Sequence, residues 1–368
     1  MKRSEIKIGL VALFAVLALA FLCRPGYPQS TPEELANQII WPVINLSGEI
    51  HYEQGRYAEA EKDFLSALER AERFGSQDPR LATTLNNLAL AYSAQGKYAE
   101  AEPVYKRALG IFEKVLGPDH PEVATSLRNL ATLYRSVGKY AEADPLFKRA
   151  LAIGEKVLGP DHPEVAISLN NLAQSYTDQG RYGEAEPLFK RALSILDKEP
   201  GPEDSNVAAV LNNLAMLYRR QAKYAQAEPL YKRALAIWEK AFGAEHPNVA
   251  LNLDNLGLVY AAQGKFVEAE PLHKRALEIL EKVLGPEHPD VAISLNNLAE
   301  LYLRQGKYGD AEPLYKRALI IMEKALGSEH PNMATVLENY AALLRKTNRE
   351  AEAKQLEARA KAIRAKQK

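Results

Sequence analysis

Cysteine is nearly absent from this chain of 368 residues, which contains only Cys23. A single cysteine excludes an intramolecular disulfide and any metal site built from several cysteines. An excess of one charge is also lacking, because 47 Lys and Arg residues balance 47 Asp and Glu residues. A neutral chain gives no electrostatic reason to expect nucleic acid as a partner.

Phe and Trp are scarce, with nine Phe and two Trp. Hydrophobic residues still make up 47% of the chain and charged residues 26%, which is ordinary for a soluble folded protein and unlike a disordered one. The interior must therefore be built mainly from Ala and Leu, which suits closely packed helices.

The N-terminus carries a basic segment followed by an apolar run. Met1–Lys7 contains three basic residues, and Ile8–Cys23 contains only apolar or small residues. This order is typical of an export signal. The run is shorter than the roughly 20 residues of a spanning helix, so we weigh an uncleaved anchor, a cleaved signal peptide and a lipoprotein modified at Cys23.

The N-terminal pattern divides the chain and predicts its location. Residues 1–23 are the expected signal peptide or membrane anchor, and residues 24–38 a Pro-rich linker and lead-in. Because the basic end of such a segment stays in the cytoplasm, the rest of the chain is expected to be exported. It would be periplasmic, or anchored in the membrane and facing away from the cytoplasm.

A spacing of 42 residues organises the remainder of the sequence. The block Asn-Asn-Leu-Ala at 86–89 recurs at this spacing, and we call the asparagines in its second position the ladder asparagines. They are Asn87, Asn129, Asn171, Asn213, Asn255, Asn297 and Asn339. Glycines keep the same register from Gly96 onward, except that Ala222 replaces one of them. A degenerate repeat with Leu46 at the ladder position precedes these, so the array is expected over 39–347, with a capping helix at 348–368.

Each repeat is predicted to form two helices. In the first helix, apolar residues recur at the spacing of one helical face: Leu85, Leu88, Ala89 and Tyr92. Gly96 ends this helix, because glycine adopts the left-handed conformation of a helix terminus. The second helix covers about Tyr98–Leu116. One such pair cannot bury its apolar face alone, whereas a stack of eight can, and this predicts an all-α solenoid.

The pattern L-x-x-L-A-x-x-Y-x-x-x-G-x-Y-x-x-A over residues 85–101 resembles the tetratricopeptide repeat. The segment Leu-Gly-Pro-Asp-His-Pro at 116–121 is similar to the linker of the 42-residue variety found in kinesin light chains and many bacterial proteins. The resemblance covers roughly residues 40–366. It implies an α-solenoid, a right-handed superhelix of about eight tandem helix-turn-helix repeats whose first helices line a concave groove. It also implies a protein-binding scaffold, without identifying the partner.

The ladder asparagines are the main candidates for binding. They lie on the side of the first helix opposite its core face, and asparagine costs about 0.5 kcal/mol relative to alanine inside a helix. A carboxamide both donates and accepts hydrogen bonds, as holding a peptide backbone requires. In peptide-binding tetratricopeptide proteins this asparagine commonly has that role. The alternatives are a hydrogen bond to a neighbouring helix, or simple retention after recent duplication.

Side chains next to the ladder vary from repeat to repeat. The position of Leu90 is occupied in turn by Leu90, Thr132, Gln174, Met216, Leu258, Glu300 and Ala342. The position of Ala94 is occupied by Ala94, Ser136, Asp178, Arg220, Ala262, Arg304 and Lys346. We call these two positions and the ladder asparagines together the ladder face. A constant asparagine beside variable neighbours predicts selective recognition of extended peptides.

Four arginines are expected near this face: Arg135, Arg219, Arg220 and Arg304. Arginine would suit acidic or carboxylate-bearing peptide segments. The alternative is that these arginines are solvated charges on the helix surface.

Repeated charged residues and histidines are interpreted as structural. Lysines follow an acid by four residues, a spacing that stabilises helices, in Glu102–Lys106, Asp144–Lys148, Glu186–Lys190, Glu228–Lys232, Glu270–Lys274 and Glu312–Lys316. Five histidines occupy the loops between repeats: His120, His162, His246, His288 and His330. Each loop supplies only one histidine, so a helix cap or a solvated role is expected in place of a metal site.

The sequence thus predicts a non-catalytic scaffold that binds a protein or peptide partner in the groove, on the extracytoplasmic side of the membrane. We expect no enzymatic activity, no cofactor and no nucleic acid partner. Membrane contact is expected through residues 8–23 if they are not cleaved. The alternative function is a self-assembling spacer or an accessory subunit of an envelope complex, so self-association stays open.

Overall fold

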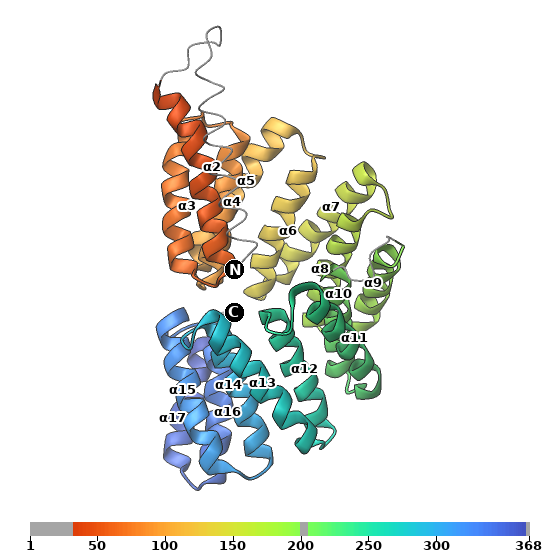
Figure 1. Ribbon diagram of the computed structural model, residues 1–368, viewed down its shortest axis with the longest axis vertical. Helices are drawn as coiled ribbons and strands as arrows, with labels where there is room; N and C mark the ends of the chain where they lie inside the picture. The colour runs from red at the N-terminus through yellow and green to blue at the C-terminus, as the bar shows by residue number, and fades with distance from the viewer. Residues whose placement is uncertain (1–31, 199–204, 366–368) are drawn as a thin grey trace. The chain divides into compact units, whose positions relative to one another are not determined.

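The computed structural model describes residues 32–198 and 205–365 of the chain, which form sixteen helices and no strand (Figure 1). The N-terminal helices are α2 (Pro32–Glu53), α3 (Tyr57–Glu72), α4 (Pro79–Ala94), α5 (Tyr98–Leu116), α6 (Pro121–Ser136), α7 (Tyr140–Leu158), α8 (Pro163–Asp178) and α9 (Tyr182–Leu196). The C-terminal helices are α10 (Ser205–Arg220), α11 (Tyr224–Phe242), α12 (Pro247–Ala262), α13 (Phe266–Leu284), α14 (Pro289–Arg304), α15 (Tyr308–Leu326), α16 (Pro331–Lys346) and α17 (Glu350–Ala365). The predicted class, an all-α array of tandem helix pairs, is confirmed.

The predicted signal or anchor at 1–23, with Cys23, lies outside the described residues. Helix α2 begins at Pro32, inside the segment 24–38 that was expected to lead into the array. None of the helices in 32–198 and 205–365 combines the length and apolar character that crossing a membrane requires.

The loops between repeats use histidine to start the next helix. In His162, Nδ1 accepts a hydrogen bond of 3.2 Å from the backbone N–H of Glu164, which satisfies one of the free donors of the helix N-terminus. His120, His246, His288 and His330 make the same contact with the residue two positions later. A proline follows each of them at the first helical position, where its missing N–H costs nothing. The capping role predicted for these histidines is confirmed.

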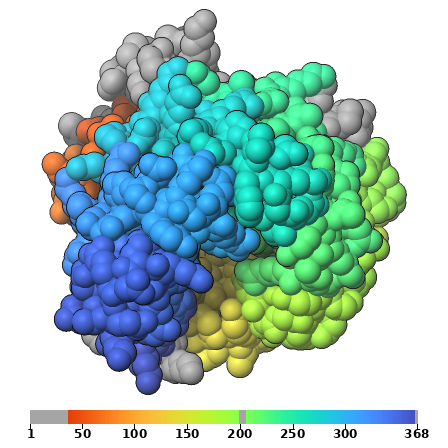
Figure 2. All heavy atoms as spheres, turned by 90° about the horizontal axis from the view of Figure 1, so that it is seen from below, coloured from red at the N-terminus to blue at the C-terminus, as the bar shows by residue number. Residues whose placement is uncertain are grey.

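The chain divides into two compact units, one reaching to Tyr134 and the other beginning at Arg135. Within each unit, helices of a repeat pack together, as α4 does with α5 and α12 with α13, and second helices contact the next first helix, as α3 does α4 and α13 does α14. In the space-filling view of the chain, successive segments of the C-terminal unit, from green to blue, adjoin one another (Figure 2). Each unit is therefore a stack of helix pairs in which neighbours along the sequence are neighbours in space.

The core of each pair depends on small residues. Alanines such as Ala101 and Ala108 are completely buried, which lets the helix backbones approach closely. One large ring per repeat fills the space between them, as Tyr105 does in α5. The corresponding residues in later repeats are also buried: Phe147, Phe189, Tyr231, His273 and Tyr315.

Five of the six predicted acid–lysine pairs form, with N–O distances of 2.6–2.7 Å. The pair predicted between Asp144 and Lys148 is the exception. Asp144 instead accepts hydrogen bonds from Arg181 at 2.9 Å and from Ser175 at 2.8 Å, both in the next repeat. A partner across the repeat boundary thus replaces the partner one turn away.

Candidate binding cavity

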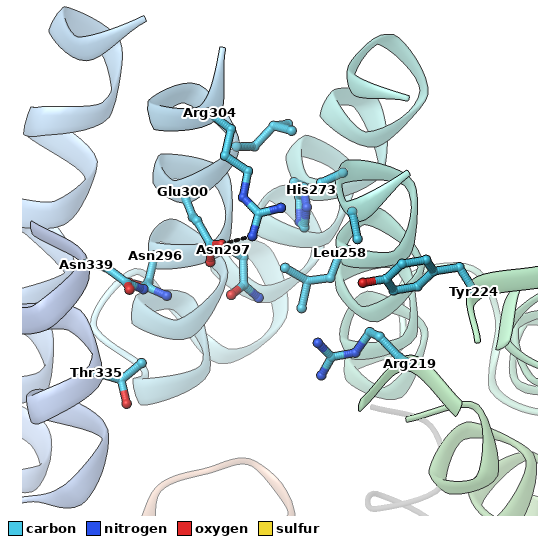
Figure 3. A pocket seen from close by; sticks show the side chains of 13 residues that line it. Arg219, Tyr224, Leu258, His273, Asn296, Asn297, Glu300, Arg304, Thr335 and Asn339 are labelled. Atoms are coloured by element: carbon cyan, nitrogen blue, oxygen red, sulfur yellow. Dashed lines mark hydrogen bonds and ion pairs between the residues drawn. The ribbon is translucent and has the colours of Figure 1, made fainter. Parts of the chain in front are cut away.

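A cavity of about 400 Å³ lies in the C-terminal unit among helices α10, α11, α12, α13, α14 and α16 (Figure 3). Its lining includes four of the residues that the sequence singled out: Arg219, Asn297, Arg304 and Asn339. Variable positions of the ladder face also line it: Leu258, Ala262 and Glu300. The face inferred from the repeat pattern thus borders a real concavity in this part of the array.

The first helices present these side chains because each contributes one face at helical spacing. Asn297, Glu300 and Arg304 follow one another along α14, separated by three and four residues. The Arg304 guanidinium lies 2.5 Å from the Glu300 carboxylate, so these two charges offset each other (Figure 3). Arg304 is therefore less available to an acidic ligand than the sequence suggested.

Arg219 differs from the other three arginines, because it has no carboxylate partner within the part of the chain that the structure describes. It lies near the end of α10 and borders the cavity together with Tyr224, which begins α11. The buried phenol of Tyr231 lies close to Arg219. Burial raises the pKa of Tyr231 to about 12, and the neighbouring cation opposes that rise.

Arg135 and Arg220 converge on one carboxylate. Nη2 of Arg220 lies 3.0 Å from Oδ1 of Asp178, and Nε of Arg135 lies 3.8 Å from Oδ2 of the same residue. Arg135 also donates to Gln174, and burial lowers the pKa of the Arg135 guanidinium. Two cations therefore share one anion at this cluster, and neither is a simple solvated charge.

Four of the ladder asparagines hydrogen-bond to the preceding repeat. Asn213 donates from Nδ2 to Oδ1 of Asn170 at 2.9 Å, in a buried setting. Asn255 donates to Asn212 at 3.2 Å, and Asn339 donates to Asn296 at 3.0 Å. Asn87 donates to Asn45 at 3.4 Å and to Glu49 at 3.2 Å. These bonds join consecutive first helices, which is the structural alternative considered for the ladder.

The other three ladder asparagines, Asn129, Asn171 and Asn297, have no side-chain hydrogen bond with the described residues. The usual acceptor is the asparagine one residue before the ladder position in the preceding repeat. For Asn129 that residue is Asn86, whose Oδ1 accepts a hydrogen bond from Ser126 within the same unit. Of these three asparagines, Asn297 borders the cavity.

For Asn297, the residue at the acceptor position is Asp254, which belongs to a buried pair that the sequence analysis overlooked. Position 254 carries an aspartate, and its Oδ1 lies 2.7 Å from Nδ1 of His273. Both side chains are buried, at 3% and 0% exposure for Asp254 and His273. Gly257 stands opposite the ring, where a Cβ atom would come within 2.7 Å of Nε2.

This cluster left a signal in the sequence, since all three of its residues break the repeat. The other repeats between Ala89 and Tyr315 have Phe or Tyr at the position of His273 and Ala at the position of Gly257, whereas in the first repeat Gly48 lies against Phe64. One earlier repeat carries Asn170, Ala173 and Phe189 at the three positions. The cluster can be found in the sequence by looking for positions that differ between repeats, because its three residues differ from those of the neighbouring repeats.

A model of the tetratricopeptide repeat matches more than half of the chain, over residues 43–114, 85–156, 132–198, 206–282, 251–319 and 290–366. The chain belongs to the tetratricopeptide repeat family. The family predicted from the residues at 85–121 is therefore confirmed.

Solved structures of tetratricopeptide-like proteins are similar to this chain. A putative kinesin light chain from Podosopora anserina with nearly identical TPR-like repeats is 30% identical, covering 56% of this chain and 97% of that chain with a TM-score of 0.46. A Rap protein complexed with competence and sporulation factor has a TM-score of 0.69 at 16% identity, over 100% of both chains. The Rap conjugation gene regulator of plasmid pLS20, in complex with the Phr* peptide, has a TM-score of 0.64 at 14% identity, over 91% of this chain and 95% of that one. At these identities the likeness to the Rap proteins is one of fold.

Proposed function

We propose that this tetratricopeptide repeat protein is a non-catalytic scaffold that binds an extended peptide segment of a partner protein along the ladder face. The observation that carries the proposal is the lining of the cavity. Asn297, Asn339, Leu258 and Glu300 were assigned to the ladder face from sequence, and the structure places them around one concavity. Ligand sites are usually concave and orient their ligands through polar groups at defined positions.

The ladder asparagines support this proposal because some are bonded to the preceding repeat and others are not. Asparagines bonded between repeats hold consecutive first helices in register. Within the C-terminal unit, we infer that Asn171 and Asn297, which lack such bonds, present a donor and an acceptor to the main chain of a peptide. The peptide complex of the pLS20 Rap regulator is an example of a similar fold that binds a peptide.

Selection of displayed peptides tests the proposal. Random dodecapeptides displayed on phage are selected on the full 368-residue chain, and the enriched sequence is synthesised with a fluorescent label. Fluorescence anisotropy then compares its affinity for the wild type, for Asn171→Ala/Asn297→Ala and for Asn332→Ala, a control in the first turn of α16. We expect a loss of at least tenfold in the double variant only. Failure to enrich any peptide, or equal affinity for all three proteins, would overturn the proposal.

The extracytoplasmic location is a separate part of the proposal and rests on the sequence of residues 1–23. An alkaline phosphatase fused after Lys368 is active only when exported, whereas a green fluorescent protein fused there fluoresces only when it stays in the cytoplasm. We expect an active phosphatase and a dark fluorescent protein. The reverse pattern would remove the export proposal and leave the scaffold proposal intact.

A further inference from the structure

His273 brings a buried ring nitrogen to the cavity of the C-terminal unit. Its side chain lines that cavity and has no exposed area (Figure 3). Nδ1 lies 2.7 Å from Oδ1 of Asp254, whereas Nε2 has no hydrogen-bond partner among the described residues. The absence of a Cβ atom at Gly257 makes room for this nitrogen. A buried polar atom without a partner costs free energy, so a ligand group that pairs with Nε2 would be stabilising.

The bond to Asp254 determines what Nε2 can bind. A carboxylate only accepts hydrogen bonds, so the proton between the two side chains comes from Nδ1 of His273. In the neutral imidazole, Nε2 then has a lone pair and no proton. Nε2 is therefore an acceptor, and its partner must be a group that donates a hydrogen bond.

The orientation of Asp254 toward the ring replaces a bond between first helices. Asp254 stands where an earlier repeat has Asn86, which accepts a hydrogen bond of 3.2 Å from Ser126. The serine that corresponds to Ser126 is Ser294, and within the described ranges neither its hydroxyl nor Oδ2 of Asp254 has a hydrogen-bond partner. The carboxylate thus holds His273 in place of the contact that the earlier repeat makes.

The other lining residues favour a neutral donor attached to apolar carbon. Arg219 adds positive charge to the lining, whereas the charge of Arg304 is offset by Glu300. The charge of Arg219 would repel a cationic donor such as an ammonium group. Leu258 and Ala261 line the cavity with apolar surface, against which carbon atoms of a ligand can pack.

We propose that this cavity binds a neutral hydroxyl group, which donates a hydrogen bond to Nε2 of His273 while its carbon atoms pack against Leu258 and Ala261. Asp254 is a positioning residue that orients the ring. The hydroxyl belongs either to a threonine side chain of the bound peptide, which rests on the proposed function, or to a free alcohol. A site built around a hydroxyl discriminates against an analogue without it, because the buried acceptor is then left unpaired.

The test compares probes of nearly equal shape with and without the hydroxyl donor. Two labelled, terminally blocked dodecapeptide pools carry either Thr or Val at one central position and a mixture of residues without hydroxyl groups elsewhere. Their affinity for the full chain is measured by fluorescence anisotropy. Cyclohexanol and cyclohexyl methyl ether are measured in parallel by ligand-observed NMR, because they present a hydroxyl and its blocked form without a peptide.

Two variants assign any preference to His273. Asp254→Asn/Gly257→Ala/His273→Phe removes the ring nitrogen and copies a combination that is buried elsewhere in the chain, at Asn170, Ala173 and Phe189. His120→Asn is the control for the loss of a histidine. The His120 ring caps the helix that begins at Pro121, and asparagine also caps helices.

A third measurement observes the ring nitrogen itself. The full chain is prepared with isotope-labelled histidine, and the spectrum of the triple variant identifies the signals of His273 by their loss. We expect Nε2 to be unprotonated in the free protein and its resonance to move on addition of cyclohexanol, with no change on addition of the ether. A protonated Nε2 in the free protein would overturn the proposal.

The expected result is at least tenfold tighter binding of the Thr pool than of the Val pool by the wild type and by His120→Asn. The preference should disappear in the triple variant, which should bind the Val pool as the wild type does. Equal binding of the two pools with an unmoved Nε2 resonance would mean an ordered water only, and would leave the peptide scaffold standing. A preference that survives in the triple variant would also overturn the site at His273.

Binding of cyclohexanol but of neither pool would separate the two proposals in the other direction. With the same dependence on His273, it would support a site for a free alcohol and count against the peptide scaffold. Binding of none of the probes would overturn both proposals.

Discussion

Nδ1 of His273 lies 2.7 Å from Oδ1 of Asp254, and both side chains are buried between α12 and α13. A buried ionisable pair is unusual in an array whose other repeats fill this place with an aromatic ring. The ring of His273 fits because Gly257 has no Cβ atom there. Three departures from the period therefore form one physical unit, next to the cavity.

The first prediction concerns the energy of this pair. His273→Phe alone leaves Asp254 buried without its partner, and removing one member of a buried pair costs about 3–5 kcal/mol. The triple variant Asp254→Asn/Gly257→Ala/His273→Phe should recover that loss. Urea unfolding of the three proteins measures both values, and a single variant as stable as the triple one would contradict the coupling.

The second prediction separates the two kinds of ladder asparagine. Asn213 is 7% exposed and bonded to Asn170, so Asn213→Ala leaves a buried acceptor unsatisfied. We expect a loss of about 1–2 kcal/mol in the free energy of unfolding. Asn171→Ala should change stability by less than about 0.5 kcal/mol, because Asn171 makes no such bond. Equal losses in urea unfolding would show that the observed bonds do not distinguish the two.

The third prediction concerns Ala222, which replaces the glycine that follows the first helix in the neighbouring repeats. Ala222 adopts a φ of 55°, whereas Gly264 at the same place has a φ of 76°. Left-handed backbone costs a residue with a Cβ atom about 1 kcal/mol. Ala222→Gly should therefore raise the free energy of unfolding by about this amount, and Gly264→Ala should lower it. Thermal and urea unfolding test the pair, and shifts of the same sign would refute the explanation.

The fourth prediction concerns acid stability. Hydrogen bonds from Arg349 and then Lys316 lower the pKa of Glu312 to about 2. A carboxyl group whose folded pKa is depressed stabilises the fold above its unfolded pKa, and that contribution is lost as the pH falls toward 2. Because the Glu312 side chain is 24% exposed, we expect only about 0.5–1 kcal/mol.

Glu312→Gln should remove this contribution. The difference in unfolding free energy between wild type and variant should be full at pH 7 and vanish near pH 2. Glu329→Gln, on the exposed loop before α16, serves as the control. A wild-type advantage that does not change with pH would contradict the assignment.

The fold could be predicted well because the 42-residue spacing is regular and because residues close in sequence set the helix boundaries. Gly96, Pro121 and the capping His162 each set a helix boundary through their own backbone chemistry, and the structure keeps those boundaries. Helical spacing alone assigned Asn297 and Asn339 to one face of the first helices, and both line the cavity.

The hydrogen-bond and ion-pair partners that side chains find in neighbouring repeats could not be predicted from the sequence. Helical periodicity says nothing about whether Asn213 reaches Asn170, or whether Asp144 prefers Arg181 to Lys148, because these choices depend on the packing of separate helices. The site at His273 was missed for a related reason. The prediction was based on the residues that recur in every repeat, whereas Asp254, Gly257 and His273 differ from their equivalents in the neighbouring repeats.

The most direct test of the central claim is the affinity of the selected dodecapeptide for the full chain and for Asn171→Ala/Asn297→Ala. Melting temperatures are recorded on the same samples. The account predicts at least tenfold weaker binding with an unchanged melting temperature, because neither asparagine is bonded within the described fold. Unchanged affinity in the double variant would contradict the claim that the ladder face holds the peptide.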